Sequence, residues 1–194
     1  MSHYETGIFD EKVPYLKFGQ GERTLVIFPG TSSLYISLSA EAPMQAKLYQ
    51  KVLPPGVTYY ILDYPKELPS TATYESIASN FADIIRKYIG KAYIAGISFG
   101  GFIATTFAAQ YPELTEHLFL IITGYKMSDS GMRMFVERGL ESAHANDGYK
   151  LIRVFDNLYG VWWARWLVKI MNWKNRKIKL AKMNPLSTFI TAYS

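Results

Sequence analysis

Over the first 124 residues, short runs of apolar residues alternate with stretches in which apolar and polar residues follow a helical period. Short runs of apolar residues predict strands that are covered on both faces. Between them lie stretches with helical periodicity, and in 74–88 the apolar residues recur with the spacing of an amphipathic helix. The strand candidates are 13–18, 24–28, 57–62, 93–97 and 117–122, and the helix candidates are 37–52, 74–88 and 102–110. This alternation predicts an α/β fold, a mostly parallel sheet with helices on both faces.

Beyond residue 124 the pattern changes. Residues 126–194 contain helical stretches at 132–143, 149–158 and 161–182, but no further apolar run that predicts a buried strand. We therefore divide the chain into an α/β core, 1–125, and a helical region, 126–194.

Composition places the chain among globular proteins, because 49% of its 194 residues are hydrophobic and 15% are aromatic. The absence of cysteine excludes disulfides and thiolate metal sites, and no cluster of His, Asp and Glu has metal-ligand spacing. No stretch has the pattern of a signal peptide or the length of a membrane span. The expectation is a protein that needs no metal or cofactor and is cytoplasmic, either free or peripheral to a membrane.

The stretch that carries chemistry is Gly96-Ile-Ser98-Phe-Gly100, which lies between the strand candidate 93–97 and the helix candidate 102–110. A G-x-S-x-G sequence between a strand and a helix is the context of a nucleophile elbow. Gly96 and Gly100 lack a Cβ, so the chain can turn sharply and leave the Ser98 hydroxyl exposed. The alternative is a small-residue turn that merely joins the two elements.

The order of elements over about 13–125 resembles that of the α/β-hydrolase family, with Ser98 at the position of the nucleophile. The resemblance implies that the N–H groups of Thr31 and Phe99 form the oxyanion hole. In that family a helical cap follows the sixth strand, and the region 126–194 has that position. The chemistry implied is the hydrolysis of an ester or related small acyl substrate.

Two shorter sequences are similar to those of the maspardin-like branch of that family and its bacterial relatives. Pro29-Gly30 stands where the wider family often has His-Gly, and Asp63-Tyr64-Pro65 follows the next strand. Asp63 is interpreted as a turn residue rather than a catalytic acid.

The base and acid of a catalytic triad are harder to find. The family places them after two further strands, and the sequence ends first, so we expect a fragment that lacks both. His3 lies near the N-terminus, and His117 opens a strand, a strand length away from Ser98. Asp129 and His144 would preserve the family order of Ser, Asp and His. However, His144 lies in a polar stretch that indicates a helix end.

The basic charge of the chain belongs to its C-terminal region. Residues 1–150 hold 13 Lys and Arg against 15 Asp and Glu, whereas 151–194 hold 8 against Asp156 alone. Within 161–182 these charges alternate with tryptophans, which leaves two interpretations open. The segment is either a cap helix over the acyl pocket or an interfacial helix that contacts a membrane surface. Nucleic acid is not an expected partner, because no base-reading module accompanies the charges.

Two functions remain open from the sequence. One is a serine hydrolase of the α/β-hydrolase fold, catalytically incomplete as it stands. The other is a non-catalytic protein that keeps the fold as a binding or adaptor module. Truncation would leave the apolar strand 117–122 at the sheet edge, so we also expect self-association.

Overall fold

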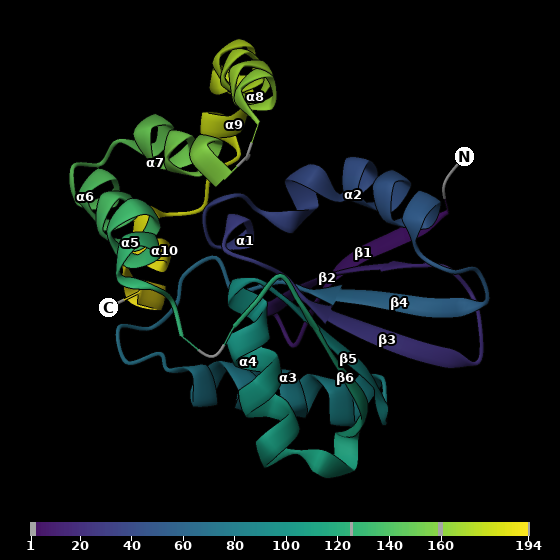
Figure 1. The fold of residues 1–194 in the computed structure, drawn as a ribbon. Helices are drawn as coiled ribbons and strands as arrows, with labels where there is room; N and C mark the ends of the chain where they lie inside the picture. Colours follow the sequence, from purple (N-terminus) through teal and green to yellow (C-terminus); the bar gives the residue numbers. More distant parts are fainter. Residues whose placement is uncertain (1–2, 125, 159–160, 194) are drawn as a thin grey trace.

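The computed structural model describes residues 3–124, 126–158 and 161–193, and it confirms the α/β fold (Figure 1). In these residues six strands form one sheet in the order β1-β2-β4-β3-β5-β6. Strands β3 to β6 are parallel, whereas β1 and β2 run antiparallel to their neighbours. The strands are β1 (Tyr4–Phe9), β2 (Val13–Phe18), β3 (Arg23–Phe28), β4 (Val57–Leu62), β5 (Ala92–Ile97) and β6 (Thr115–Ile121).

Helices cover both faces of the sheet, as predicted (Figure 1). One face packs against α2 through a cluster that includes Phe18 and Ile61, and the other packs against α3 and α4 around Phe28. The core on the second face is aromatic, since the Phe28 ring lies 4.7 Å from that of Phe81 and 5.4 Å from that of Phe107. The helices of this half are α1 (Ser32–Tyr35), α2 (Leu38–Val52), α3 (Tyr74–Tyr88) and α4 (Phe99–Gln110), and a 3-10 turn covers Pro112–Leu114.

The predicted bounds hold within a few residues, and the first turn of α3 shows why. Thr73 caps this helix through a reciprocal pair of hydrogen bonds with Ser76, which satisfies N–H groups that the helix cannot. Two of the differences from expectation lie next to Ser98 or at the end of β6. Helix α4 begins at Phe99 rather than at 102, and β6 ends at Ile121 because Ile122 adopts φ 52° and leaves the extended conformation.

The region after β6 is helical, and in Figure 1 it lies beyond the carboxyl ends of the parallel strands. The predicted helix over 161–182 is interrupted at Asn175, where α8 ends and α9 begins. The elements are α5 (Asp129–Gly131), a π-helical turn (Met132–Glu137), α6 (Arg138–His144), α7 (Gly148–Val154), a 3-10 turn (Phe155–Leu158), α8 (Trp162–Lys174), α9 (Arg176–Ala181) and α10 (Leu186–Tyr193).

Helix α10 and the segment before it return to the α/β half. The Phe189 side chain is fully buried and belongs to the same hydrophobic cluster as Phe28, where its ring lies 6.3 Å from that of Tyr35 in α1 and it packs against Gly139 in α6. The Asn184 side chain donates to the carbonyl of Ser33 (3.2 Å), and the Thr188 hydroxyl donates to the carbonyl of Lys66. The final helix is therefore part of the main core, although its sequence lies within the predicted cap region. The predicted boundary residue, Tyr125, lies outside the described residues.

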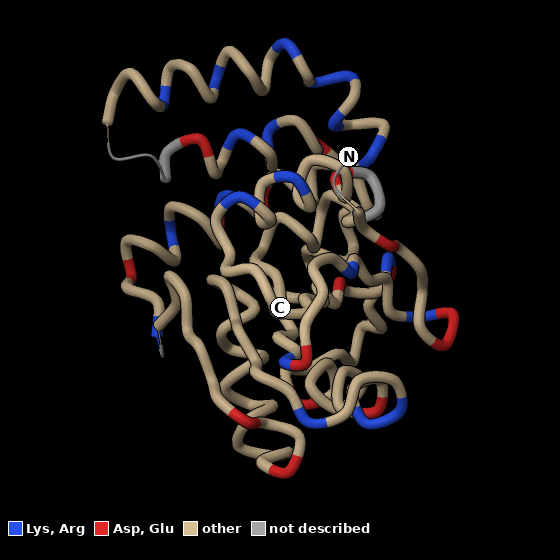
Figure 2. The backbone as a smooth tube through the Cα atoms, turned by 90° about the vertical axis from the view of Figure 1, so that its right-hand side faces the viewer, with Lys and Arg blue, Asp and Glu red and all other residues tan. Residues whose placement is uncertain are grey.

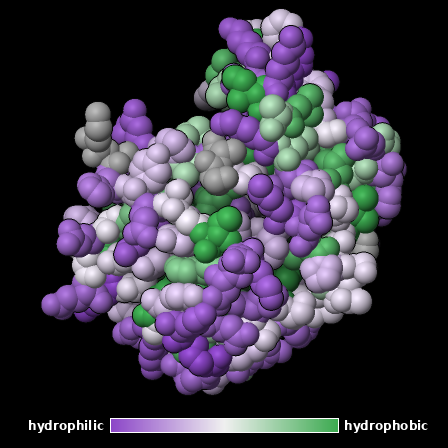
Figure 3. Space-filling model, turned by 180° about the vertical axis from the view of Figure 1, so that it is seen from behind, coloured by the Kyte–Doolittle hydropathy of each residue, from purple (hydrophilic) through white to green (hydrophobic). Residues whose placement is uncertain are grey.

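The molecular surface reflects the charge asymmetry of the sequence. Lys and Arg follow one another along α8 and α9 in Figure 2 without an intervening Asp or Glu. These two helices project from the rest of the molecule, and in Figure 3 apolar side chains lie beside hydrophilic ones on the projection. Within the described part of the chain, no helix combines the length and apolar character needed to cross a membrane.

Candidate active site

Ser98 occupies a strained position between β5 and α4. Its backbone adopts φ 52° and ψ −117°, a conformation that costs a non-glycine residue about 1–3 kcal/mol. The Ser98 N–H donates to the carbonyl of Ile121 on β6 (2.9 Å), and its carbonyl accepts from the Gly101 N–H (2.9 Å). Neighbouring elements thus hold Ser98 at a sharp turn, where the residue is exposed to solvent.

Close approach of main chains explains the glycines on either side. A Cβ on Gly100 would lie 2.1 Å from the carbonyl oxygen of Phe28, and a Cβ on Gly96 would lie 2.6 Å from the Cβ of Ala104. Both distances are impossible for real atoms. The absence of side chains at Gly96 and Gly100 therefore lets α4 pack directly on β3 and β5 and brings the end of β3 to Ser98.

The loop after β3 lies against Ser98. A Cβ on Gly30 would lie 3.3 Å from the Ser98 Cβ and 3.9 Å from its hydroxyl oxygen. Thr31 follows at the start of α1, and Phe99 is the first residue of α4. The first N–H groups of a helix have no acceptor within it, so both residues can offer an N–H beside the serine.

Two residues that sequence reasoning did not assign to the site hold this loop. The buried Tyr64 hydroxyl donates to the carbonyl of Pro29 (2.6 Å), and its ring packs edge-on against Phe99. Asp63, also buried, accepts from the N–H groups of Leu38 and Tyr64 (2.9 Å each). The aspartate therefore fixes the start of α2 and the turn that aims Tyr64.

Burial dominates the ionisation of Asp63. It raises the pKa of this carboxyl to about 7, even though the hydrogen bonds from Leu38 and Tyr64 favour the charged form. The interpretation of Asp63 as a turn residue agrees with these contacts.

Helix α10 covers the residues expected to bind an oxyanion. The Tyr193 hydroxyl shares a hydrogen bond with the Thr31 hydroxyl (2.5 Å), and its ring lies 5.2 Å from that of Phe99. Burial raises the pKa of Tyr193 above its ordinary value. No sequence signal pointed to this contact, because Thr31 and Tyr193 are 162 positions apart.

The candidate acid and base are not joined to the serine. Asp129 in α5 and His144 at the end of α6 are both exposed, and no hydrogen bond links either side chain to Ser98 within the described residues. His117 pairs with Tyr93 at the far end of β5, a strand length from Ser98. His3 lines a cavity at the amino ends of the parallel strands. The same described ranges contain no cluster of His, Asp and Glu that could hold a metal ion.

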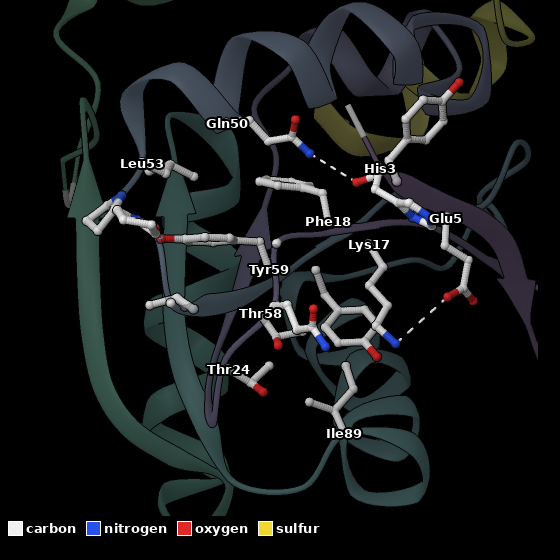
Figure 4. A pocket seen from close by; sticks show the side chains of 18 of the residues that line it. His3, Glu5, Lys17, Phe18, Thr24, Gln50, Leu53, Thr58, Tyr59 and Ile89 are labelled. Atoms are coloured by element: carbon white, nitrogen blue, oxygen red, sulfur yellow. Dashed lines mark hydrogen bonds and ion pairs between the residues drawn. The ribbon is translucent and has the colours of Figure 1, made fainter. Parts of the chain in front are cut away.

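Cavities lie at both ends of the sheet in the described part of the chain. One, of about 520 Å³, lies between α3, α4 and α10, and its wall includes Phe102, Met132, Val136 and Tyr193. The other, of about 1250 Å³, lies at the amino ends of the strands, where Lys17 is paired with Glu5 (Figure 4). Ser98 lines neither cavity, but Tyr193, which lines the smaller one, is hydrogen-bonded to Thr31.

Comparison with known proteins finds relatives by structure alone. No family model matches the chain, and no curated protein matches its sequence. An α/β-hydrolase enzyme from a Medee basin deep-sea metagenome library is 17% identical over 97% of this chain and 70% of its own, with a TM-score of 0.72. The enol-lactonase from Burkholderia xenovorans is 14% identical over 97% of this chain and 72% of its own, with a TM-score of 0.69.

A third solved structure, a membrane phospholipase A described as a bacterial virulence factor, is 18% identical over 98% of this chain and 62% of its own (TM-score 0.61). The chain thus spans between 62% and 72% of the length of these three proteins. Their identities are low, so the likeness shows a common fold. The resemblance to the maspardin-like branch stays a prediction.

Proposed function

The chain has the α/β-hydrolase fold, and on this premise we propose that it carries the nucleophile and oxyanion half of a serine hydrolase site. The observation that carries the proposal is the conformation of Ser98, strained between β5 and α4 with Gly30 against it. Strain of this kind persists where the surroundings enforce it, and it leaves the hydroxyl accessible for attack.

In the proposed reaction the Ser98 hydroxyl oxygen attacks the carbonyl carbon of an ester or related acyl group. The negative charge that develops on the carbonyl oxygen is stabilised by the N–H groups of Thr31 and Phe99 and by the positive end of the α4 dipole. Loss of one such donor typically lowers the rate about 10²–10³-fold. The smaller cavity, whose wall includes Phe102, Met132 and Val136, is the proposed place for the acyl chain.

The proton of Ser98 needs a base, and none is hydrogen-bonded to it in residues 3–124, 126–158 and 161–193. The proposal therefore assigns the base and its acid to groups outside these residues. A serine without an oriented base keeps only a small part of its catalysed rate. The enol-lactonase and the phospholipase among the structural neighbours support ester-type chemistry by their names alone.

The second candidate is a binding or adaptor protein that keeps the fold without turnover. The contact between Tyr193 and Thr31 favours it, because this contact places a half-buried aromatic side chain beside a residue that the reaction requires. The two candidates differ in whether Ser98 can be acylated.

Acylation of Ser98 by an activated ester separates them. The chain is treated with p-nitrophenyl acetate in the presence of imidazole, which supplies the missing base, and the acetyl group is located by peptide mass mapping. We expect selective acetylation of Ser98 in the wild type, its loss in Ser98→Ala, and no comparable labelling of the exposed Ser130. Equal labelling of Ser98 and Ser130 would mean that the turn does not activate the serine and would favour the adaptor.

A further inference from the structure

Helix α8 turns its apolar face away from the protein. Trp163, Trp166, Ile170 and Trp173 recur at helical positions i, i+3, i+7 and i+10, which form one stripe along the helix. The three tryptophans of this stripe are 54%, 59% and 57% exposed. A surface helix of a globular protein normally directs such a stripe into the core, so this one is available to something outside the chain.

The opposite face of α8 is held by polar contacts. Asn172 is buried, and its amide nitrogen donates to the Asp156 carboxylate, while its amide oxygen accepts from the Lys179 ammonium (2.7 Å). These bonds tie α8 to the preceding 3-10 turn and to α9. The orientation of the helix is therefore fixed, with the tryptophans facing outward.

The charge around this stripe has a single sign. Residues 161–182 contain seven Lys and Arg and no Asp or Glu, and α8 and α9 show Lys and Arg along their whole length in Figure 2. Helix α9 also exposes apolar side chains, since Ile178 is 58% exposed and Leu180 is 42% exposed. In Figure 1 α8 lies farthest from the sheet with α9 beneath it, and Figure 3 shows a projection that stands clear of the rest of the molecule.

We propose that α8 and α9 form a docking surface for an anionic lipid bilayer. Trp side chains favour the headgroup layer, where the ring is buried and its N–H remains hydrated. Lys and Arg beside them meet the negative potential of anionic lipids, each contributing to binding near the surface. The helix lies in the interface, since the described chain has no helix able to span the bilayer. This surface is independent of the role of Ser98.

The chain contains its own probe for this contact. All four of its tryptophans lie in α8, so the intrinsic tryptophan fluorescence reports on this helix alone. We expect the emission to shift to the blue when vesicles of phosphatidylcholine and phosphatidylglycerol are added. Vesicles of pure phosphatidylcholine should give a much weaker shift, and raised salt should weaken binding to the anionic vesicles.

Variants measured by co-flotation with the same vesicles test both parts of the surface. Trp166→Ser should lower the partition coefficient at least about tenfold, because apolar surface is no longer withdrawn from water. Lys169→Gln, Lys174→Gln and Lys177→Gln should each lower it about fivefold. Matched controls lie on α2, where Met44→Ser and Lys47→Gln remove an exposed apolar residue and an exposed charge and should have no effect. Ser98→Ala should bind as the wild type does.

Three results would overturn the proposal: no binding to anionic vesicles, equal binding to neutral ones, or equal losses in the α2 controls. Sedimentation velocity tests whether a second copy of the chain occupies the tryptophan face. A dimer that Trp166→Ser dissolves would show that a second copy covers the tryptophan face instead. Circular dichroism of each variant confirms that the loss of binding is not a loss of folding.

Discussion

At the residue scale, the conformation of Ser98 depends on two neighbouring glycines that have no Cβ. Around Ser98 the main chains of β3, β5 and α4 approach so closely that Gly96 and Gly100 leave no room for a methyl group. These contacts explain how a serine at positive φ is tolerated, because the strain is local and the packing around it is extensive.

Gly100→Ala should destabilise the chain by about 3 kcal/mol, since the new methyl group must displace the carbonyls of Phe28 and Pro29. It should also abolish the acetylation of Ser98. Gly124→Ala is the control, because its Cβ would lie 3.7 Å from the nearest atom and its φ is not positive. Urea unfolding measures both variants, and equal stabilities would show that the α4–β3 contact is not as tight as described.

Asp63 makes the stability depend on pH. In the unfolded chain an aspartate has a pKa near 3.9, whereas burial raises the pKa of folded Asp63 to about 7. Between about pH 4 and pH 7 the folded state keeps a proton that the unfolded state releases, so the free energy of unfolding should fall as the pH rises. The full effect is roughly 4 kcal/mol.

The difference between wild type and Asp63→Asn isolates this group, because other titrations cancel. The stability of the variant relative to the wild type should increase between pH 4 and pH 7 in urea unfolding series. A difference that stays constant with pH would show that the hydrogen bonds from Leu38 and Tyr64 keep the pKa near its ordinary value.

At the scale of elements, the helices and strands that local sequence patterns determine could be predicted. Five of the six strands and helices α2, α3 and α4 follow from apolar runs and helical spacing. Strand β1 was missed because its residues are mostly exposed and form an outer antiparallel edge, so they carry no run of buried positions. Helix α10 was missed because Ser, Thr and Ile weaken its helical signal, and its stability comes from Phe189 in a distant core.

In the candidate site, too, the parts set by local sequence could be predicted and the parts set by tertiary contacts could not. Ser98, its glycines and the loop at Gly30 can be predicted because strand, turn and helix are adjacent in sequence. The supports supplied by Tyr64 and Tyr193 cannot, because they depend on tertiary contacts across 35 and 162 positions. A pattern read along the chain contains no information on such pairs.

Phe189→Ala tests whether α10 belongs to the core. The side chain is fully buried, so its truncation should cost about 3–5 kcal/mol, the range for a core phenylalanine. Leu48→Ala on α2 is the comparison, because Leu48 is 56% exposed and should change stability by less than about 0.5 kcal/mol. If α10 were a loosely attached cap, chemical denaturation would give similar values for both variants.

At the scale of the whole molecule, the sheet has one unprotected edge. No strand of the described ranges pairs with the outer side of β6, and Leu118, Phe119, Leu120 and Ile121 are 37–51% exposed. Glu116 near the start of β6 is the charge on this strand, whereas Leu118–Ile121 contains neither a charge nor a proline, which are the usual protections of an edge.

The isolated chain should therefore self-associate through β6. Leu120→Lys places a charge on the edge and should shift the sedimentation coefficient toward that of a monomer, whereas Met44→Lys on α2 should not. A wild-type monomer over the micromolar range would contradict this expectation, and so would equal effects of the two lysines.

The contact between Tyr193 and Thr31 also sets the order in which the molecule can acquire its structure. It joins residues 162 positions apart, whereas Gly30 and Ser98 are linked through neighbouring parallel strands. Contacts of long sequence separation form late, because the entropy of closing the intervening chain is lost before they stabilise anything. During synthesis on the ribosome, the elbow and its loop emerge long before α10. The nascent chain thus passes through a stage in which Tyr193 does not yet cover Thr31 and Phe99.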